Sequence, residues 1–266
     1  VVCSDALTAE HYWIPGRPRV EPATEIHQGV RVYRHPVAHL FGSSQTFPNL
    51  RRLAILLSLL PGTLPILRRI GRYLPWIPDL EPALNRLGPF DLVHGVNISL
   101  ESPMIAAWRY ARRQGLPFIS TPFVHTGVPG ERFVERHYTM PHQLEVLRDS
   151  DLVFVQTEIE ARRVAELGVP RERLALLGMG VNPHDAREAD PEGFRRKYDL
   201  NGPLVAFVGS ITRDKGAIHL AEACRVLWHR DSRPITLVLA GAPVTEFNRY
   251  YATLPDEDRA RVRLLG

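Results

Sequence analysis

The stretch VAFVGSITRDKGAIHLAEA, residues 205–223, contains the residue types that can hold a phosphate. An apolar run stops at Gly209, and a helical pattern begins after Lys215 and Gly216. A strand, a short loop and a helix in this order would direct free backbone N–H groups and a helix N-terminus at one point, which suits a phosphate. Lys215 would add a mobile positive charge, and both glycines would let a ligand approach the backbone closely. An ordinary strand-turn-helix corner with a solvated lysine fits the same residues, so both interpretations stay open here.

Several other motifs that could carry chemistry are absent or lack the right context. Neither G-x-x-x-x-G-K-[ST] nor G-x-G-x-x-G occurs, which argues against an ATPase or a dinucleotide-dependent oxidoreductase. His137 and His142 lack the partner pattern of a metal site, and we assign them no role. Asp149-Ser150-Asp151 is a D-x-D motif, whose two carboxylates could bind a divalent ion. Such metal motifs follow a strand, whereas this one precedes LVFVQT, so we predict that its aspartates end a helix and bind no metal.

Composition and charge place the chain in a broad class. With 266 residues, 44% hydrophobic and 23% charged, it is long enough for one large or two medium domains. The net charge of +4 favours anionic partners in general, and nothing in the sequence selects nucleic acid. Cys3 and Cys224 form no C-x-x-C pair, so we expect neither a disulfide nor a zinc site. The two unpaired cysteines fit a reducing cytoplasm, so a cytoplasmic location is expected. We find no signal peptide and no apolar run of bilayer-spanning length.

Short apolar strands alternate with helical stretches along the chain. We predict strands at 91–96, 117–121, 151–157, 203–209 and 235–241, and helices near 102–114, 158–167 and 217–229. Alternation of this kind is typical of parallel β-α-β units and an α/β fold. The Gly-, Pro- and acid-rich segment GMGVNPHDAREADPEG indicates a boundary between two domains.

Residues 50–78 combine an almost continuous apolar surface with five arginines, at positions 51, 52, 68, 69 and 72. Two interpretations compete for this segment. Its helices could pack on the sheet with the arginines extended to solvent, or they could form a membrane-surface element that meets anionic lipid. We favour packing and keep peripheral contact with the inner face of the membrane as the alternative.

The ordered set of these segments resembles retaining glycosyltransferases of family 4. VAFVGSITRDKGAIHLAEACRVL resembles the start of the family's C-terminal domain, while DLVHGVN and GLPFISTPFVHTG resemble strands of its N-terminal domain. SDLVFVQTEIEARRVAELGVPRERLALLGMGVNP resembles the lead into the linker between the two. The resemblance implies two Rossmann-like domains of GT-B type. Residues 1–182 would form the acceptor-side domain without its first strand, and residues 183–266 the truncated start of the domain that binds the donor.

The resemblance also implies roles for individual residues. Gly209, Ser210, Arg213, Lys215 and Gly216 would bind the diphosphate of a nucleotide-sugar donor, with Lys215 in the place of the family's lysine. Ser210 stands where the family has an arginine, which removes a bidentate contact. Arg213 could take over part of that role, or it could simply be a solvated arginine. His125 matches the family histidine that contacts the transferred sugar, and a surface or core histidine is its alternative.

The implied reaction is transfer of a sugar with retention of anomeric configuration, with no obligatory metal and no cofactor. The family's glycine-rich turn would precede Val1 and its pair of glutamates would follow Gly266, so we expect this chain to be an inactive internal fragment. The acceptor is unknown, and a lipid-linked molecule or a glycan would be compatible. A sugar-nucleotide epimerase of similar architecture and a non-catalytic sugar-nucleotide or lipid-binding relative remain as alternatives.

Overall fold

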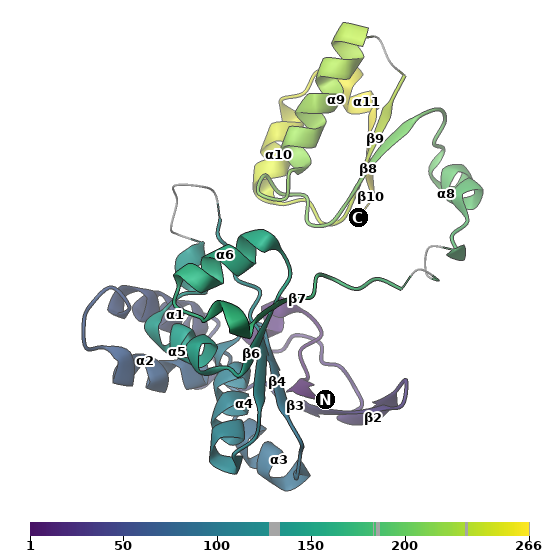
Figure 1. Ribbon diagram of the computed structural model, residues 1–266. Coiled ribbons are helices and arrows are strands. Elements are labelled where there is room, and N and C mark those ends of the chain that lie inside the picture. Colours follow the sequence, from purple (N-terminus) through teal and green to yellow (C-terminus); the bar gives the residue numbers. More distant parts are fainter. Residues whose placement is uncertain (128–133, 183, 185–186, 232–233, 266) are drawn as a thin grey trace. The chain divides into compact units, whose positions relative to one another are not determined.

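The computed structural model describes residues 1–127, 134–182, 184, 187–231 and 234–265. The chain divides into two compact units, Val1–Gly180 and Val181–Gly266. Each unit is built around its own sheet of parallel strands joined by helices, shown in Figure 1.

The main sheet of the first unit has four parallel strands in the order β4-β5-β6-β7. These strands are Val93–Val96, Phe118–Thr121, Leu152–Val155 and Leu174–Leu176. Phe118, Val153 and Val155 are almost fully buried in the unit's core, which explains why the apolar runs of the sequence form strands here. Three of the four strands lie where the sequence predicts them. The fourth strand, β7, was not predicted. It follows α6, in the segment that resembles the family's approach to the linker between its two domains.

Nine further elements precede β4. A second sheet, of order β1-β3-β2, contains Val2–Ser4, Val30–His35 and Thr24–His27, and its β2 runs antiparallel to β3. Helices α1, α2 and α3 are Thr46–Leu57, Leu64–Ile70 and Leu80–Leu87. Short 3-10 turns η1, η2 and η3 lie at Ala9–Tyr12, Leu40–Gly42 and Gly71–Tyr73.

The helices that connect the main strands are α4, α5 and α6, which are Glu101–Gln114, Pro141–Asp149 and Glu158–Glu166. Two short 3-10 turns, η4 and η5, occupy Glu135–His137 and Arg171–Arg173. Helix α6 begins at a cap in which the Thr157 hydroxyl accepts the N–H of Glu160 at 3.1 Å. Helix α5 ends at Asp149, so the prediction that the D-x-D aspartates close a helix is confirmed.

The second unit has three parallel strands in the order β10-β9-β8, at Val262–Leu265, Thr236–Ala240 and Leu204–Val208. Figure 1 shows α9 and α10 together on one side of this sheet. Its helices α8, α9, α10 and α11 are Pro191–Tyr198, Ala217–Asp231, Thr245–Ala252 and Asp256–Ala260. Strands and helices alternate as the sequence predicts, because the apolar faces of α9 and β9 must cover one another.

The arginine-rich segment 50–78 packs only in part as we expected. Helices α1 and α2 form a small core of their own, and Figure 1 shows them grouped with α5. That core contains Met140, which precedes α5, and no residue of the strands: Ala54, Leu67, Leu74 and Met140. The prediction that this segment packs on the sheet is confirmed for Ile77, which lies in the main core with Phe118 and Val153. It is wrong for α1 and α2, because the residue before α5, Met140, supplies their apolar partner. In the part of the chain that the structure describes, no helix is long and apolar enough to cross a bilayer.

Candidate active site

The carboxyl ends of β4, β5 and β6 come together at one edge of the first unit's sheet, and His125 lies there. The loop after β5 carries His125, whose ring is exposed and lies 5.1 Å from the ring of Tyr138, centroid to centroid. A ligand can therefore reach this imidazole. Parallel α/β sheets bind ligands outside the carboxyl ends of their strands, so the position suits the role that the sequence predicts for His125.

A buried carboxylate fixes the loop that carries His125. Glu160 is 6% exposed, and its two oxygens accept the backbone N–H of Val124 at 2.7 Å and of Gln156 at 2.8 Å. One side chain in the first turn of α6 therefore joins the loop after β5 to the loop after β6. We did not single out Glu160 from the sequence. Its signal is the spacing Thr157-x-x-Glu160 after a strand, which marks a helix start with a paired acceptor.

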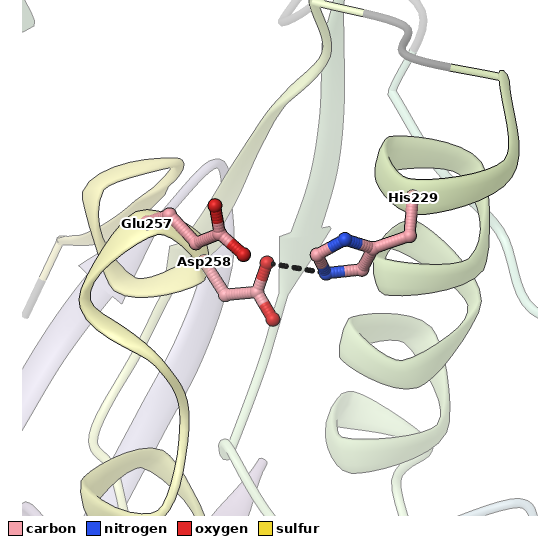
Figure 2. A group of neighbouring side chains, drawn as sticks. All are labelled: His229, Glu257 and Asp258. Atoms are coloured by element: carbon pink, nitrogen blue, oxygen red, sulfur yellow. Dashed lines mark hydrogen bonds and ion pairs between the residues drawn. The ribbon is translucent and has the colours of Figure 1, made fainter.

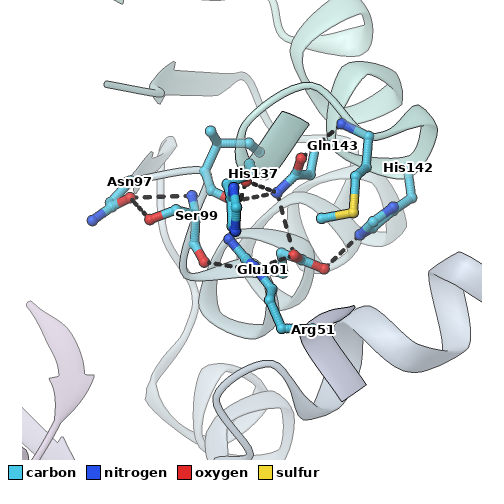
Figure 3. Close-up of polar contacts among 9 residues, drawn as sticks. Arg51, Asn97, Ser99, Glu101, His137, His142 and Gln143 are labelled. Carbon is cyan, nitrogen blue, oxygen red and sulfur yellow. Dashed lines mark hydrogen bonds and ion pairs between the residues drawn. The ribbon is translucent and has the colours of Figure 1, made fainter. Parts of the chain in front are cut away.

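A second buried network lies behind the same edge, and Figure 3 shows its side chains. Glu101, at the start of α4, has no exposed surface, and its carboxylate accepts from Arg51 Nη1 at 2.5 Å. The other carboxylate oxygen lies 2.5 Å from His142 Nε2, so His142 has a structural partner. Arg51 also donates to the carbonyl oxygens of Ser99 and His137, at 3.1 and 3.0 Å. Helix α1 is thereby joined to the loop after β4 and to η4.

Gln143 completes this network from α5. Its side-chain amide donates to the carbonyl oxygens of His137 at 2.9 Å and Ile98 at 3.3 Å, and to Glu101 Oε1 at 3.2 Å. Nearby, Asn97 Oδ1 accepts the hydroxyl of Ser99 at 2.7 Å and so closes the turn after β4. The network contains one carboxylate and one guanidinium in close contact, which is the arrangement that makes a buried charge tolerable.

In the second unit, the loop 209–216 connects β8 to α9 as the sequence predicts. Its backbone runs close to the end of β9: Gly241 has φ of 143°, and a Cβ added there would lie 2.0 Å from the carbonyl oxygen of Gly209. Ile211 anchors the middle of the loop in the core, with no exposed surface. The loop is therefore held at both strand ends, and its polar residues project from a fixed support.

The side chains of Ser210, Arg213 and Lys215 are all exposed on this loop. The N–H groups of Gly209 and Gly216 donate to the carbonyls of Ala240 and Arg213, so these two amides are already occupied. In the first turn of α9, the N–H of Ala217 donates to the carbonyl of Thr212 and that of Leu220 to the carbonyl of Gly216. The N-terminus of α9 still carries the positive end of the helix dipole. Gly216 has φ of 89°, a left-handed conformation that favours glycine.

The loop is also organised by its own polar contacts. Arg213 Nε lies 2.6 Å from Glu246 Oε1 in α10, so the arginine that could replace the family's missing one is already paired. The pKa of the Asp214 carboxyl is lowered, chiefly by its hydrogen bond with the Thr212 side chain. Lys215 is left as the exposed cation nearest the helix start.

One group of side chains could offer three ligand atoms to a metal: His229, Glu257 and Asp258, drawn in Figure 2. Asp258 is 1% exposed, and both of its oxygens are already engaged. His229 Nε2 lies 2.9 Å from Oδ1, and Arg225 Nε donates to Oδ2 at 2.8 Å. A guanidinium in direct contact opposes a cation at the same carboxylate, so this group joins α11 to α9 and does not fit a metal site.

Comparison with known proteins decides the family. A family model described as a glycosyl transferase 4-like domain matches residues 2–180. The chain belongs to this glycosyl transferase 4-like family. The matched range contains His125, whereas the loop 209–216 lies beyond it.

Solved structures resemble this glycosyl transferase 4-like chain in fold. Sucrose-phosphate synthase from Thermosynechococcus elongatus matches with a TM-score of 0.60 and 17% identity, over 96% of this chain and 58% of its own. A UDP-forming α,α-trehalose-phosphate synthase from Burkholderia vietnamiensis matches with a TM-score of 0.60 and 14% identity, over 99% and 70%. HepE of Anabaena in complex with UDP-glucose matches with a TM-score of 0.56 and 15% identity, over 71% and 52%. These likenesses confirm the predicted α/β fold of GT-B type.

A curated relative matches over a short stretch. α-Maltose-1-phosphate synthase of Mycolicibacterium smegmatis is 56% identical over 48 residues, which are 18% of this chain and 11% of that protein. The chain also spans about half the length of HepE. These comparisons therefore concern the part of the protein that this chain contains.

Proposed function

We propose that the protein containing this chain transfers a sugar from a nucleoside diphosphate sugar to an acceptor hydroxyl, with retention at the anomeric carbon. In this reaction the bond between the anomeric carbon and the donor diphosphate breaks. The acceptor oxygen forms a bond to that carbon on the same face, and the hydroxyl proton passes to the leaving diphosphate or to solvent. Membership of the glycosyl transferase 4-like family supports this reaction class.

The observation that carries the proposal is the corner at 209–216, where Lys215 is exposed beside the N-terminus of α9. A positive side chain and a helix N-terminus both stabilise negative charge, and that charge increases on the diphosphate as the sugar leaves. In this proposal Lys215 binds the diphosphate, and Ser210, Gly209 and Gly216 border it. Arg213 contributes only if it leaves Glu246.

His125 is the residue that we propose to contact the transferred sugar. Its exposed imidazole can donate to or accept from a sugar hydroxyl, and Glu160 holds the loop beneath it in place. A contact of this kind orients the sugar and needs no change in protonation. The charge on the leaving group is met by Lys215 and α9, so the proposed mechanism uses no obligatory metal and no cofactor.

A non-catalytic sugar-nucleotide binder is a second candidate. It is favoured by Ser210, which supplies no charge to the diphosphate, and by the engagement of Arg213 with Glu246. A binder would hold UDP-glucose without releasing UDP, whereas a transferase releases UDP when an acceptor is present. An epimerase would alter the sugar of the nucleotide without any acceptor.

Donor binding by the 266-residue chain tests the corner directly. UDP is the probe, because HepE binds it as part of UDP-glucose. Lys215→Ala should weaken UDP binding in calorimetry by about tenfold or more, since a hydrogen bond to a charged group contributes about 1.5–3 kcal/mol. Lys197, the other lysine, is exposed on α8 and provides the matched control in Lys197→Ala.

The same calorimetric measurement can test a variant that adds a positive charge to the corner. Ser210→Arg would place a guanidinium beside the diphosphate and should bind UDP at least as tightly as the native chain. Equal UDP affinities for Lys215→Ala and Lys197→Ala would show that the corner makes no ligand contact.

A further inference from the structure

A large apolar surface of the first unit faces solvent on α1, α2 and the turn between them. Leu56 and Leu59 are 63% and 56% exposed, although they lie in one of the most apolar segments of the chain. Burying each such side chain would stabilise it by about 1.5–3 kcal/mol, so a surface of this kind normally has a partner. The other large apolar side chains exposed here are Leu53, Leu60 and Ile66.

The charged side chains that α1 and α2 themselves carry are all basic. Residues 26–78 contain seven arginines and neither aspartate nor glutamate. Arg51 pairs with Glu101 and Arg68 with Glu145, but among the described residues no acidic side chain lies within ion-pair distance of Arg52, Arg69 or Arg72. Arg52 on α1 and Arg69 on α2 are exposed, whereas Arg72 lines a separate cavity together with Glu81. The two helices therefore present positive charge that is complementary to an anionic partner.

A groove opens on the same surface. Its volume is about 630 Å³, and its apolar lining includes Trp13, Phe47, Ile55, Leu56 and Leu59. Arg51, Arg52 and Arg136 also border it. An apolar channel bordered by cations fits a molecule with a hydrocarbon chain and an anionic head, which is the chemistry of an acidic lipid.

The groove lies beside the sheet edge that carries His125. Arg51 and His137 line it, and Arg51 donates to the carbonyls of both Ser99 and His137. Tyr138 follows His137 directly, and its ring is the one that contacts the ring of His125. A lipid in the groove would therefore lie on the side of the unit where the sugar is proposed to bind.

We propose that the α1–α2 surface docks on an anionic lipid bilayer, with the exposed leucines in the hydrocarbon boundary and Arg52 and Arg69 at the lipid headgroups. The proposal of docking is supported by these residues and does not depend on the proposed transferase function. That the acceptor is a lipid drawn from the same bilayer rests on the proposed transferase function.

Vesicle sedimentation of the 266-residue chain tests the docking. The native chain should sediment with vesicles of phosphatidylcholine and phosphatidylglycerol and be released by salt, while pure phosphatidylcholine should retain little of it. Arg52→Ala should lower the partition coefficient about fivefold, as expected for one arginine near an anionic surface. The double variant Leu56→Asp with Leu59→Asp should lower it more than tenfold.

Controls separate docking from loss of fold and from function. Leu92→Asp alters a half-exposed leucine outside the surface and should bind vesicles as the native chain does. Circular dichroism verifies the fold of each variant, and Arg52→Ala tests the proposal if the double variant does not fold. UDP binding should be unchanged in these variants, so vesicle binding without UDP binding would count against the proposed function alone.

Trp13 gives a second readout, because it lines the groove. Vesicles with brominated acyl chains should quench the native chain more strongly than Trp13→Phe. Three results would overturn the docking: a native chain that stays in the supernatant with anionic vesicles, equal losses for Leu92→Asp and Leu56→Asp, or a dimer in ultracentrifugation that Leu56→Asp dissociates. The last would assign the surface to a second copy of the chain.

Discussion

Arg51 is the residue at which three parts of the first unit meet. Its side chain is 12% exposed, and the guanidinium contacts a carboxylate of α4, the loop after β4 and the carbonyl of His137. A buried ion pair adds little stability compared with apolar side chains, but removing one partner leaves an uncompensated charge. Arg51 therefore secures the α1–α2 surface to the sheet even though the pair itself is not a large source of stability.

Replacement of Arg51 by alanine should destabilise the first unit by about 3 kcal/mol, because Glu101 would then be buried without its cation. Urea denaturation followed by circular dichroism measures the change. Arg52→Ala is the matched control, since the neighbouring arginine is exposed and its loss should alter stability by less than about 0.5 kcal/mol. Similar losses for the two variants would contradict the role assigned to Arg51.

At the scale of elements, the D-x-D motif joins α4, α5 and β5. Arg112 in α4 donates to Asp149 at 2.6 Å and to Asp151 at 3.0 Å, and Asp151 also accepts the N–H of Phe118 at 2.7 Å. Between the two aspartates, the Ser150 hydroxyl donates to Ser120 at 3.0 Å. Both carboxylates are thus committed to protein donors, which supports the expectation that they bind no metal.

Asp151 should make stability depend on acid pH. Burial raises the pKa of its carboxyl, but the Phe118 N–H and Arg112 outweigh that effect and the pKa is lowered on balance. An aspartate whose pKa is lower in the folded state stabilises the fold at pH values above its pKa in the unfolded state, which is about 3.9. That stabilisation is lost as the pH falls through the pKa of the folded state.

Asp151→Asn should therefore be less stable than the native chain at pH 7, and the difference should shrink in acid. The midpoints of urea denaturation of the two chains, measured from pH 7 down to pH 3, give this difference in stability. Asp91→Asn, at an exposed aspartate before β4, serves as the control. A difference between Asp151→Asn and the native chain that stays constant down to pH 3 would contradict the assignment.

At the scale of the whole molecule, each unit contains its own core. All residues of the large cluster and of the small α1–α2 core belong to the first unit. All residues of the third cluster belong to the second unit. A unit that buries its own apolar side chains has the means to fold alone.

Residues 1–180, expressed alone, should show a cooperative thermal transition, because the sheet, its helices and both of their cores are retained. Circular dichroism measures the transition, and the full chain is the reference. The isolated unit should also keep the vesicle binding proposed for α1–α2. A broad, non-cooperative melt of residues 1–180 would show that the first unit needs the second.

The sequence alone determined the order of strands and helices and the local phosphate-type corner. Runs such as residues 152–155 and 237–240 are apolar throughout and flanked by polar or small residues, so their conformation follows from short-range pattern. Gly209, Lys215 and Gly216 are close in sequence, and their arrangement in one loop therefore needed no knowledge of the rest of the fold.

The contacts that join distant segments depend on how separate elements pack, and the sequence pattern does not predict them. Glu160 holds the loop before His125, Arg51 meets Glu101 across 50 residues of chain, and Arg213 is paired with Glu246, which lies 33 residues away. The tertiary structure also leaves Leu56 and Leu59 in solvent, where their apolar character had suggested burial. Periodicity reports which side of an element is apolar, but the partner of that side is fixed by how separate elements pack.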